Sequence, residues 1–149
     1  MRPAPLFPYL AIGLGTVLGA LLPMTARAEP MRATAATPAT VPIVRHATAE
    51  AEKTGTQRAI VTITGFTPSP SGPVEVVAIL PCDGGEREIG RFGVLPASGF
   101  TKADRSRWQH FSLTVPSGCG SAAHLIVRLV PRQGDGSGAH VDIGGAEIR

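Results

Sequence analysis

The sequence has few of the residues, and none of the spacings, from which a catalytic site is usually recognised. Its 149 residues include two cysteines and four histidines, and no two histidines lie three or four positions apart. Neither a Cys-x-x-Cys pair nor the Gly-x-Ser-x-Gly turn of serine hydrolases occurs. No pair of acidic residues has a spacing that suggests general acid–base chemistry. These absences argue against an enzyme that acts alone, and we predict no catalytic residue.

Concentrated positive charge is also missing. The sequence has 14 Lys and Arg against 11 Asp and Glu, a net charge of +3. The signal peptide predicted below carries two arginines and no acidic residue, so the mature balance is 12 minus 11, or +1. The densest basic group, Lys102, Arg105 and Arg107, is interrupted by Asp104. Because nucleic-acid-binding proteins usually present a concentrated basic face, we predict no nucleic-acid partner.

What the sequence does contain begins with a signal peptide, predicted over residues 1–28. Arg2 supplies the positive start, residues 6–22 form an uncharged apolar run, and Ala26 and Ala28 form the small-x-small pattern of a cleavage site. We therefore expect a periplasmic or secreted protein with no membrane attachment after cleavage. The alternative is an uncleaved anchor, but the run is near the minimum length for a span and is interrupted by Pro8.

The mature chain divides into two parts. Residues 29–54 are rich in Ala, Thr and Pro and show no sustained period, which predicts a flexible leader. Within it, Val41, Ile43 and Val44 are the candidates for a first edge strand. From residue 55 the composition changes to apolar runs separated by Gly, Pro, Ser and Asp. Residues 55–149 are therefore predicted to form one small domain.

The pattern of this domain is that of β-strands. Runs with period-two alternation or continuous apolar character occupy residues 58–66, 73–81, 88–96, 107–115, 123–131 and 139–148. Turn residues separate the runs, and no long helical pattern occurs. We predict an all-β fold, a single antiparallel β-sandwich or barrel of about six to seven strands.

The two cysteines, Cys82 and Cys119, both belong to the exported part. An oxidising compartment favours a disulfide between them, which would close a loop of 37 residues. The competing interpretation is a pair of metal-binding thiolates. That interpretation lacks a nearby Cys-x-x-Cys or histidine spacing, so we predict the disulfide.

Two histidines are candidates for a surface metal site. His110 and His124 both lie on the polar side of predicted strands, and they could approach each other if those strands are neighbours. With Met31 they would offer a copper or zinc site, although solvated imidazoles on a sheet are the commoner outcome, and no cofactor is predicted. The glycine-rich stretch 134–138 opens no helix, so we predict a hairpin turn there and no phosphate-binding loop.

The end of the domain carries a family resemblance. The matching residues are Leu129-Val130-Pro131-Arg132, then Val141, Ile143, Gly144, Gly145 and Ile148, and upstream Gly90, Phe92, Leu95 and Pro96. Val74-Glu75-Val76 stands where the family has Phe-Asp-Val. In this pattern the chain resembles the C-terminal domain of polyphenol oxidases, the plant-type relatives of tyrosinase, over roughly residues 55–149.

The resemblance implies a role without catalysis. In that family the domain is a β-sandwich or barrel that covers the copper entrance of the latent enzyme, while the catalytic domain holds copper with six histidines on helices. This chain has four histidines and no matching helices. The resemblance thus implies a separately made shielding or maturation partner of an exported tyrosinase-like di-copper oxidase, with copper held only by the partner. Phe100, in the connection at residues 96–108, is a candidate plug for the copper site that the family does not assign residue by residue, and the alternative is a loop aromatic that packs on its own core.

Two alternatives stay open from the sequence. One is a periplasmic copper-binding protein that uses His110 and His124. The other is a generic adhesion or scaffold module of the cell envelope, with the leader as a spacer.

The role of Arg132 is also open: it could pair with Glu75 or Asp83, or be a plain surface arginine.

Overall fold

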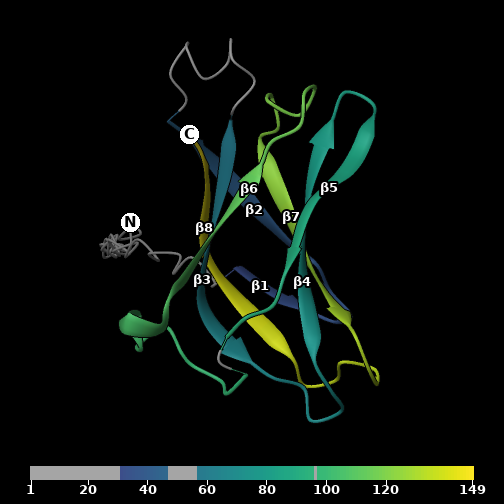
Figure 1. Cartoon of the computed structure of the whole chain (residues 1–149), viewed down its shortest axis with the longest axis vertical. Helices are drawn as coiled ribbons and strands as arrows, with labels where there is room; N and C mark the ends of the chain where they lie inside the picture. The colour runs from purple at the N-terminus through teal and green to yellow at the C-terminus, as the bar shows by residue number, and fades with distance from the viewer. Residues whose placement is uncertain (1–30, 47–56, 96) are drawn as a thin grey trace, which may run out of the picture.

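A computed structural model describes residues 31–46, 57–95 and 97–149, and in these residues the fold is all-β (Figure 1). The strands are β1 (Met31–Thr34), β2 (Ala39–Arg45), β3 (Arg58–Thr67), β4 (Val74–Cys82), β5 (Gly85–Phe92), β6 (Gln109–Thr114), β7 (His124–Pro131) and β8 (His140–Ile148). The described residues include one 3-10 turn, η1 (Arg105–Arg107), and no helix long and apolar enough to cross a membrane. The predicted fold class is confirmed. The proposed signal-cleavage residues Ala26 and Ala28, and Pro96, lie outside the described residues.

The strands form a nearly closed mixed barrel. Seven of them follow the order β5-β4-β7-β2-β8-β3-β6, and β1 pairs with β8 beside this path. Every pairing is antiparallel except that of β2 with β8, which is parallel. The first half of β2 pairs with β7 and its second half with β8. This strand therefore joins the two halves of the barrel.

The flexible leader predicted over residues 29–54 is wrong for residues 31–45, which form β1 and β2. Ala33, Ala39 and Val41 are buried in the core. Nor is β2 an edge strand, because it lies between β7 and β8. The strand candidates Val41, Ile43 and Val44 do lie in a strand, β2. The alanines around them gave no strand signal, because alanine is a weak strand former. Residues 47–54 lie outside the described part.

The core follows the period-two alternation of the strands. Inward-facing side chains are almost completely buried; they include Val61, Ile63, Val76, Leu80, Leu125, Val127, Val141 and Ile148. On β4 the outward-facing Val77 and Ile79 are buried as well, as its continuous apolar run predicted. In the sheet register Val77 lies between Arg91 and Arg128, whose long side chains can cover it.

The two ends of the strand order, β5 and β6, approach each other without a strand ladder in the described part of the chain. Side chains close this seam: the rings of Phe92 and Phe111 stack with centroids 3.7 Å apart. A Cβ on Gly90 would lie 2.7 Å from Leu113 Cδ2, so β6 packs closely against β5 at this glycine, and a larger residue would require the Leu113 side chain to move. Gly90, which belongs to the segment that resembles the family, therefore lies at a close contact between β5 and β6.

The connections gather at two ends of the barrel, and Figure 1 shows the β4–β5 and β6–β7 connections at the upper end. There a disulfide joins Cys82 to Cys119, with Cα atoms 4.2 Å apart, which confirms the predicted bridge. At the lower end lie the β3–β4 and β7–β8 connections. The hairpin predicted for 134–138 is wrong, because β2 separates β7 from β8 and the segment crosses from one to the other.

Candidate interaction surface

Three of the four segments that resemble the polyphenol oxidase domain lie on adjacent strands. Gly90 and Phe92 belong to β5, residues 74–76 begin β4, and residues 129–132 close β7 and follow it. In the register Val76 lies opposite Phe92 on one side and Leu129 on the other. The fourth segment, residues 141–148, belongs to β8, four positions from β5 along the sheet order. The fold thus places segments distant in sequence on one side of the barrel.

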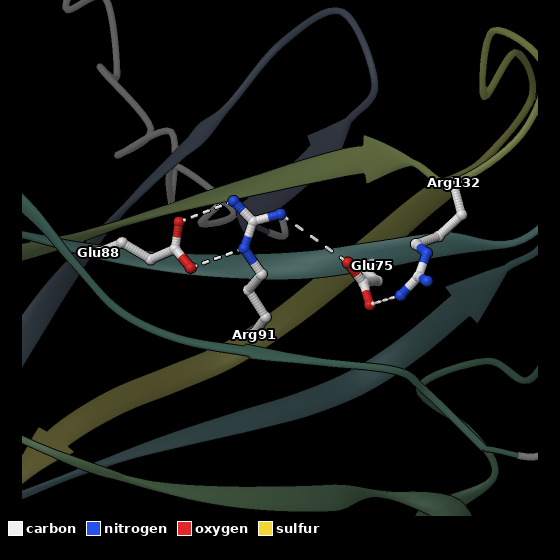
Figure 2. Close-up of polar contacts among 4 residues, drawn as sticks. All are labelled: Glu75, Glu88, Arg91 and Arg132. Carbon is white, nitrogen blue, oxygen red and sulfur yellow. Dashed lines mark hydrogen bonds and ion pairs between the residues drawn. The ribbon is translucent and has the colours of Figure 1, made fainter.

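Ion pairs connect these three strands on their outer face (Figure 2). Glu75 lies between two arginines: its Oε1 is 2.5 Å from Arg132 Nη1, and its Oε2 is 3.9 Å from Arg91 Nη1. Arg91 also donates two hydrogen bonds to Glu88, from Nε at 2.6 Å and from Nη2 at 2.9 Å. The open question about Arg132 is answered by its pair with Glu75.

Within this network, Arg91 and Glu88 favour each other's charged form. Hydrogen bonds from Arg91 are the main cause that lowers the pKa of Glu88, and the same bonds raise the pKa of Arg91. Because these groups are exposed and water screens their charges, each pair adds little to the stability of the fold. The network serves to fix the geometry of the surface around Glu75 and does little for overall stability.

An apolar groove of about 440 Å³ lies next to this network. Its walls include Phe66, Pro68, Pro73, Val74, Val94 and Leu95. A polar hollow lined by Glu75, Arg132 and Gln133 adjoins it, and the two share Pro73, Val74 and Gly93. The surface therefore has an apolar part bordered on one side by an ion pair, and residues of three resembling segments line it.

Leu95 stands at this groove with 72% of its surface exposed, the largest exposed fraction of any large hydrophobic side chain in the described residues. Its backbone is nevertheless held. The Leu95 N–H donates to Gln109 Oε1 at 3.2 Å, and Gln109 Nε2 donates to the Leu95 carbonyl oxygen. Gln109 is itself fixed at the start of β6 by its pairing with Ile63 of β3. An apolar side chain thus projects from an anchored backbone.

Phe100, predicted as the plug, is instead buried, with 4% of its surface exposed. Its backbone exchanges two hydrogen bonds with Phe66, both 2.9 Å long. The Arg107 guanidinium lies 5.2 Å from the centre of its ring, and Arg107 also donates to the carbonyl oxygens of Ser98 and Gly99. Phe100 is therefore not exposed as a plug. It packs on the core of its own domain, which was the alternative, and anchors the β5–β6 connection.

The two candidate metal-binding histidines do not meet. His110 lies on β6 and His124 on β7, and β2, β8 and β3 lie between these strands. The condition for the copper or zinc site, that the strands be neighbours, is not met. His110 Nδ1 instead shares a hydrogen bond with Thr62 Oγ1 at 2.9 Å, and Met31 lies on β1 opposite Ile143. In the described ranges no three His, Cys, Asp or Glu side chains are grouped to hold a metal ion.

The sequence analysis identified neither Leu95 as an exposed side chain nor Gln109 as the residue that holds the Leu95 backbone. Leu95 had a signal, because it belongs to the resembling Gly-x-Phe-x-x-Leu-Pro segment. Gln109 had none, because its contact joins residues 14 positions apart across the connection between β5 and β6. No protein-family model, curated protein or solved structure matches the chain. The relation to polyphenol oxidases stays a prediction from the residues quoted above.

Proposed function

We propose that this chain is a non-catalytic, exported β-domain that binds a tyrosinase-like di-copper oxidase and shields it or assists its maturation. The observation that carries the proposal is the exposed Leu95, held by its backbone beside an apolar groove. Val74, Glu75 and Arg132, all from the resembling segments, border the same surface. The identity of the partner comes from the family resemblance alone.

The composition of the surface supports binding to a protein. Protein interfaces have an apolar centre and a polar rim, and an exposed apolar patch on a small domain often marks such a site. Here the groove supplies the apolar centre, and the Glu75–Arg132 pair supplies a charged rim. Both charges are already partnered, so the rim can orient a partner without leaving a charge unpaired when water is excluded.

The same surface is poorly suited to catalysis. The side chains around the groove are mainly apolar, and Glu75 and Arg132 neutralise each other. Copper, if used, would be held by the partner, since His110 and His124 lie on separated strands. The disulfide supports folding in an oxidising compartment, and we propose a periplasmic or secreted location.

A pull-down with matched variants tests the proposal. The bait is the mature chain, residues 29–149, as wild type, Leu95→Asp and Val44→Asp, incubated with the native exported fraction. Val44 is the matched control, because it is the other exposed large hydrophobic in the described residues, 57% exposed, and lies away from the groove on β2.

We expect mass spectrometry to find a copper oxidase retained by the wild type and by Val44→Asp, and lost with Leu95→Asp. Recovery of no copper oxidase, or equal recovery with Leu95→Asp, would overturn the proposal. Recovery of envelope components alone would favour the adhesion or scaffold module instead.

A further inference from the structure

The contact between Gln109 and Leu95 occurs where the barrel has no strand ladder. β5 ends at Phe92 and β6 begins at Gln109, and the described part of the connection between them includes Leu95. At this position the Gln109 side-chain amide accepts a hydrogen bond from the Leu95 N–H and donates one to the Leu95 carbonyl oxygen. The backbone of a neighbouring antiparallel strand would make the same two bonds. A carboxamide carries the same donor and acceptor as a peptide unit, so it can replace one rung of a ladder.

We propose that Gln109 is a positioning residue that presents Leu95 to a partner. This inference rests on the proposed function, because it assigns a role to Leu95 in binding. With both backbone groups held, the direction of the Leu95 Cα–Cβ bond is fixed. The side chain therefore stands at the groove, 72% exposed, before a partner arrives.

The physical gain is that ordering is completed during folding and not during binding. Fixing the backbone of one residue has an entropic cost, and an interface residue that is already ordered avoids this cost when the complex forms. Loss of the contact should therefore weaken binding roughly tenfold, the effect of ordering one residue. The Leu95 side chain itself would be unchanged in size and chemistry.

Two substitutions separate positioning from simple packing. Gln109→Met keeps the length of the side chain and removes both hydrogen bonds. Gln109→Glu keeps the shape, but the ionised carboxylate cannot donate to the Leu95 carbonyl. When protonated, the carboxyl group has one O–H donor and one C=O acceptor, so it can restore both bonds. Protonation requires a pH below the ordinary glutamate pKa of about 4.3.

The test measures hydrogen exchange of the Leu95 amide in the mature chain at pH 7 and near pH 3.5, below that pKa. Wild type, Gln109→Met and Gln109→Glu are compared, with amides of the β3 core as a reference for global opening. We expect Gln109→Met to lose protection at both pH values. Gln109→Glu keeps an acceptor for the Leu95 N–H but loses the bond to the Leu95 carbonyl oxygen at pH 7, so its protection should lie between those of Gln109→Met and the wild type and rise in acid. Unchanged protection in Gln109→Met at pH 7, or no rise in acid for Gln109→Glu, would overturn the inference.

Affinity for the copper oxidase captured by the wild type then completes the test. Gln109→Met should weaken binding in the wild-type background and have no further effect in a Leu95→Ala background. If Leu95→Ala leaves the affinity unchanged, the proposed function fails while the exchange result stands. If Leu95→Ala weakens binding but Gln109→Met does not, positioning by Gln109 fails and the proposed function survives.

Discussion

At the scale of single residues, neighbouring glycines in β8 have different reasons to be glycine. A Cβ on Gly144 would lie 2.4 Å from Thr64 Cγ2, whereas a Cβ on Gly145 would have no atom within 4 Å. Thr64 cannot easily move away, because it is β-branched and buried and its hydroxyl donates to the Asp142 carbonyl oxygen at 3.3 Å. Only the first glycine of the Gly-Gly pair is required by packing.

We therefore predict that Gly144→Ala lowers the free energy of unfolding by about 1–3 kcal/mol, the usual cost of an added methyl group in a tight site. Gly145→Ala, the matched control, should range from no change to a gain of about 0.4–1 kcal/mol, since alanine restricts the unfolded chain. Urea unfolding of the two variants measures both values. Equal effects would contradict the packing argument.

Asp135, in the β7–β8 connection, is expected to make stability depend on pH. Its carboxylate accepts hydrogen bonds from the Ser137 N–H at 2.9 Å and from the Ser71 hydroxyl at 3.0 Å. Bonds from Ser137, and then from Ser71, lower the pKa of Asp135. The stabilisation is therefore complete above the ordinary pKa of about 3.9 and is lost as the pH falls through the lower pKa of the folded state.

The corresponding variant is Asp135→Asn, which cannot ionise. We expect the wild type to be the more stable of the two near neutral pH, and the difference to shrink in acid. Urea unfolding of both proteins from neutral pH to below about pH 3.9 measures the difference. A stability difference that stays constant with pH would exclude a contribution from the carboxylate charge.

At the scale of elements, β2 is the strand on which the barrel depends most. It alone lies between β7 and β8, yet the sequence predicted a flexible leader there. The period-two pattern predicted β3, β4, β6, β7 and β8 well, because large alternating side chains fill the core of each. For β2 the pattern gave only Val41, Ile43 and Val44 as candidates for an edge strand. Ala39 and Pro42 are weak strand formers, and the burial of Val41 depends on strands far along the chain.

Matched valine substitutions test the place of β2. Val41 is fully buried, so Val41→Ala should lower the free energy of unfolding by about 2 kcal/mol through lost burial and a cavity. Val44 is exposed on the same strand, so Val44→Ala should change it by no more than about 0.5 kcal/mol. If residues 39–45 were a flexible leader, neither substitution would have a measurable effect.

At the scale of the whole molecule, the barrel is fastened at its upper end by a covalent bond between distant connections. The Cys82–Cys119 disulfide spans 37 positions and links the end of β4 to the β6–β7 connection. On the chain-entropy account, a loop of this length stabilises the fold by roughly 3–4 kcal/mol. Compartment and cysteine count were enough to predict this bond from the sequence.

Replacement of both cysteines, Cys82→Ser with Cys119→Ser, should therefore lower the free energy of unfolding by roughly 3–4 kcal/mol in non-reducing buffer. Wild type unfolded under reducing conditions should fall to a similar value. A double variant as stable as the oxidised wild type would show that the loop is already restrained in the unfolded chain.

The fold was more predictable than the surface. Strand positions follow from local alternation, and the disulfide follows from two residues and a compartment. The exposure of Leu95 was not predicted, and for Phe100 both a plug and packing on its own core were open, because both residues lie in one irregular connection. Their exposure is decided by partners from elsewhere, Gln109 for the first and Phe66 for the second.

The most direct test of the account is the activity of the captured copper oxidase on an o-diphenol while the mature chain is titrated in. The account predicts saturable inhibition by the wild type and by Val44→Asp, and none by Leu95→Asp. An oxidation rate that does not change with the wild-type chain, or that Leu95→Asp lowers equally, would contradict a shielding role for this surface.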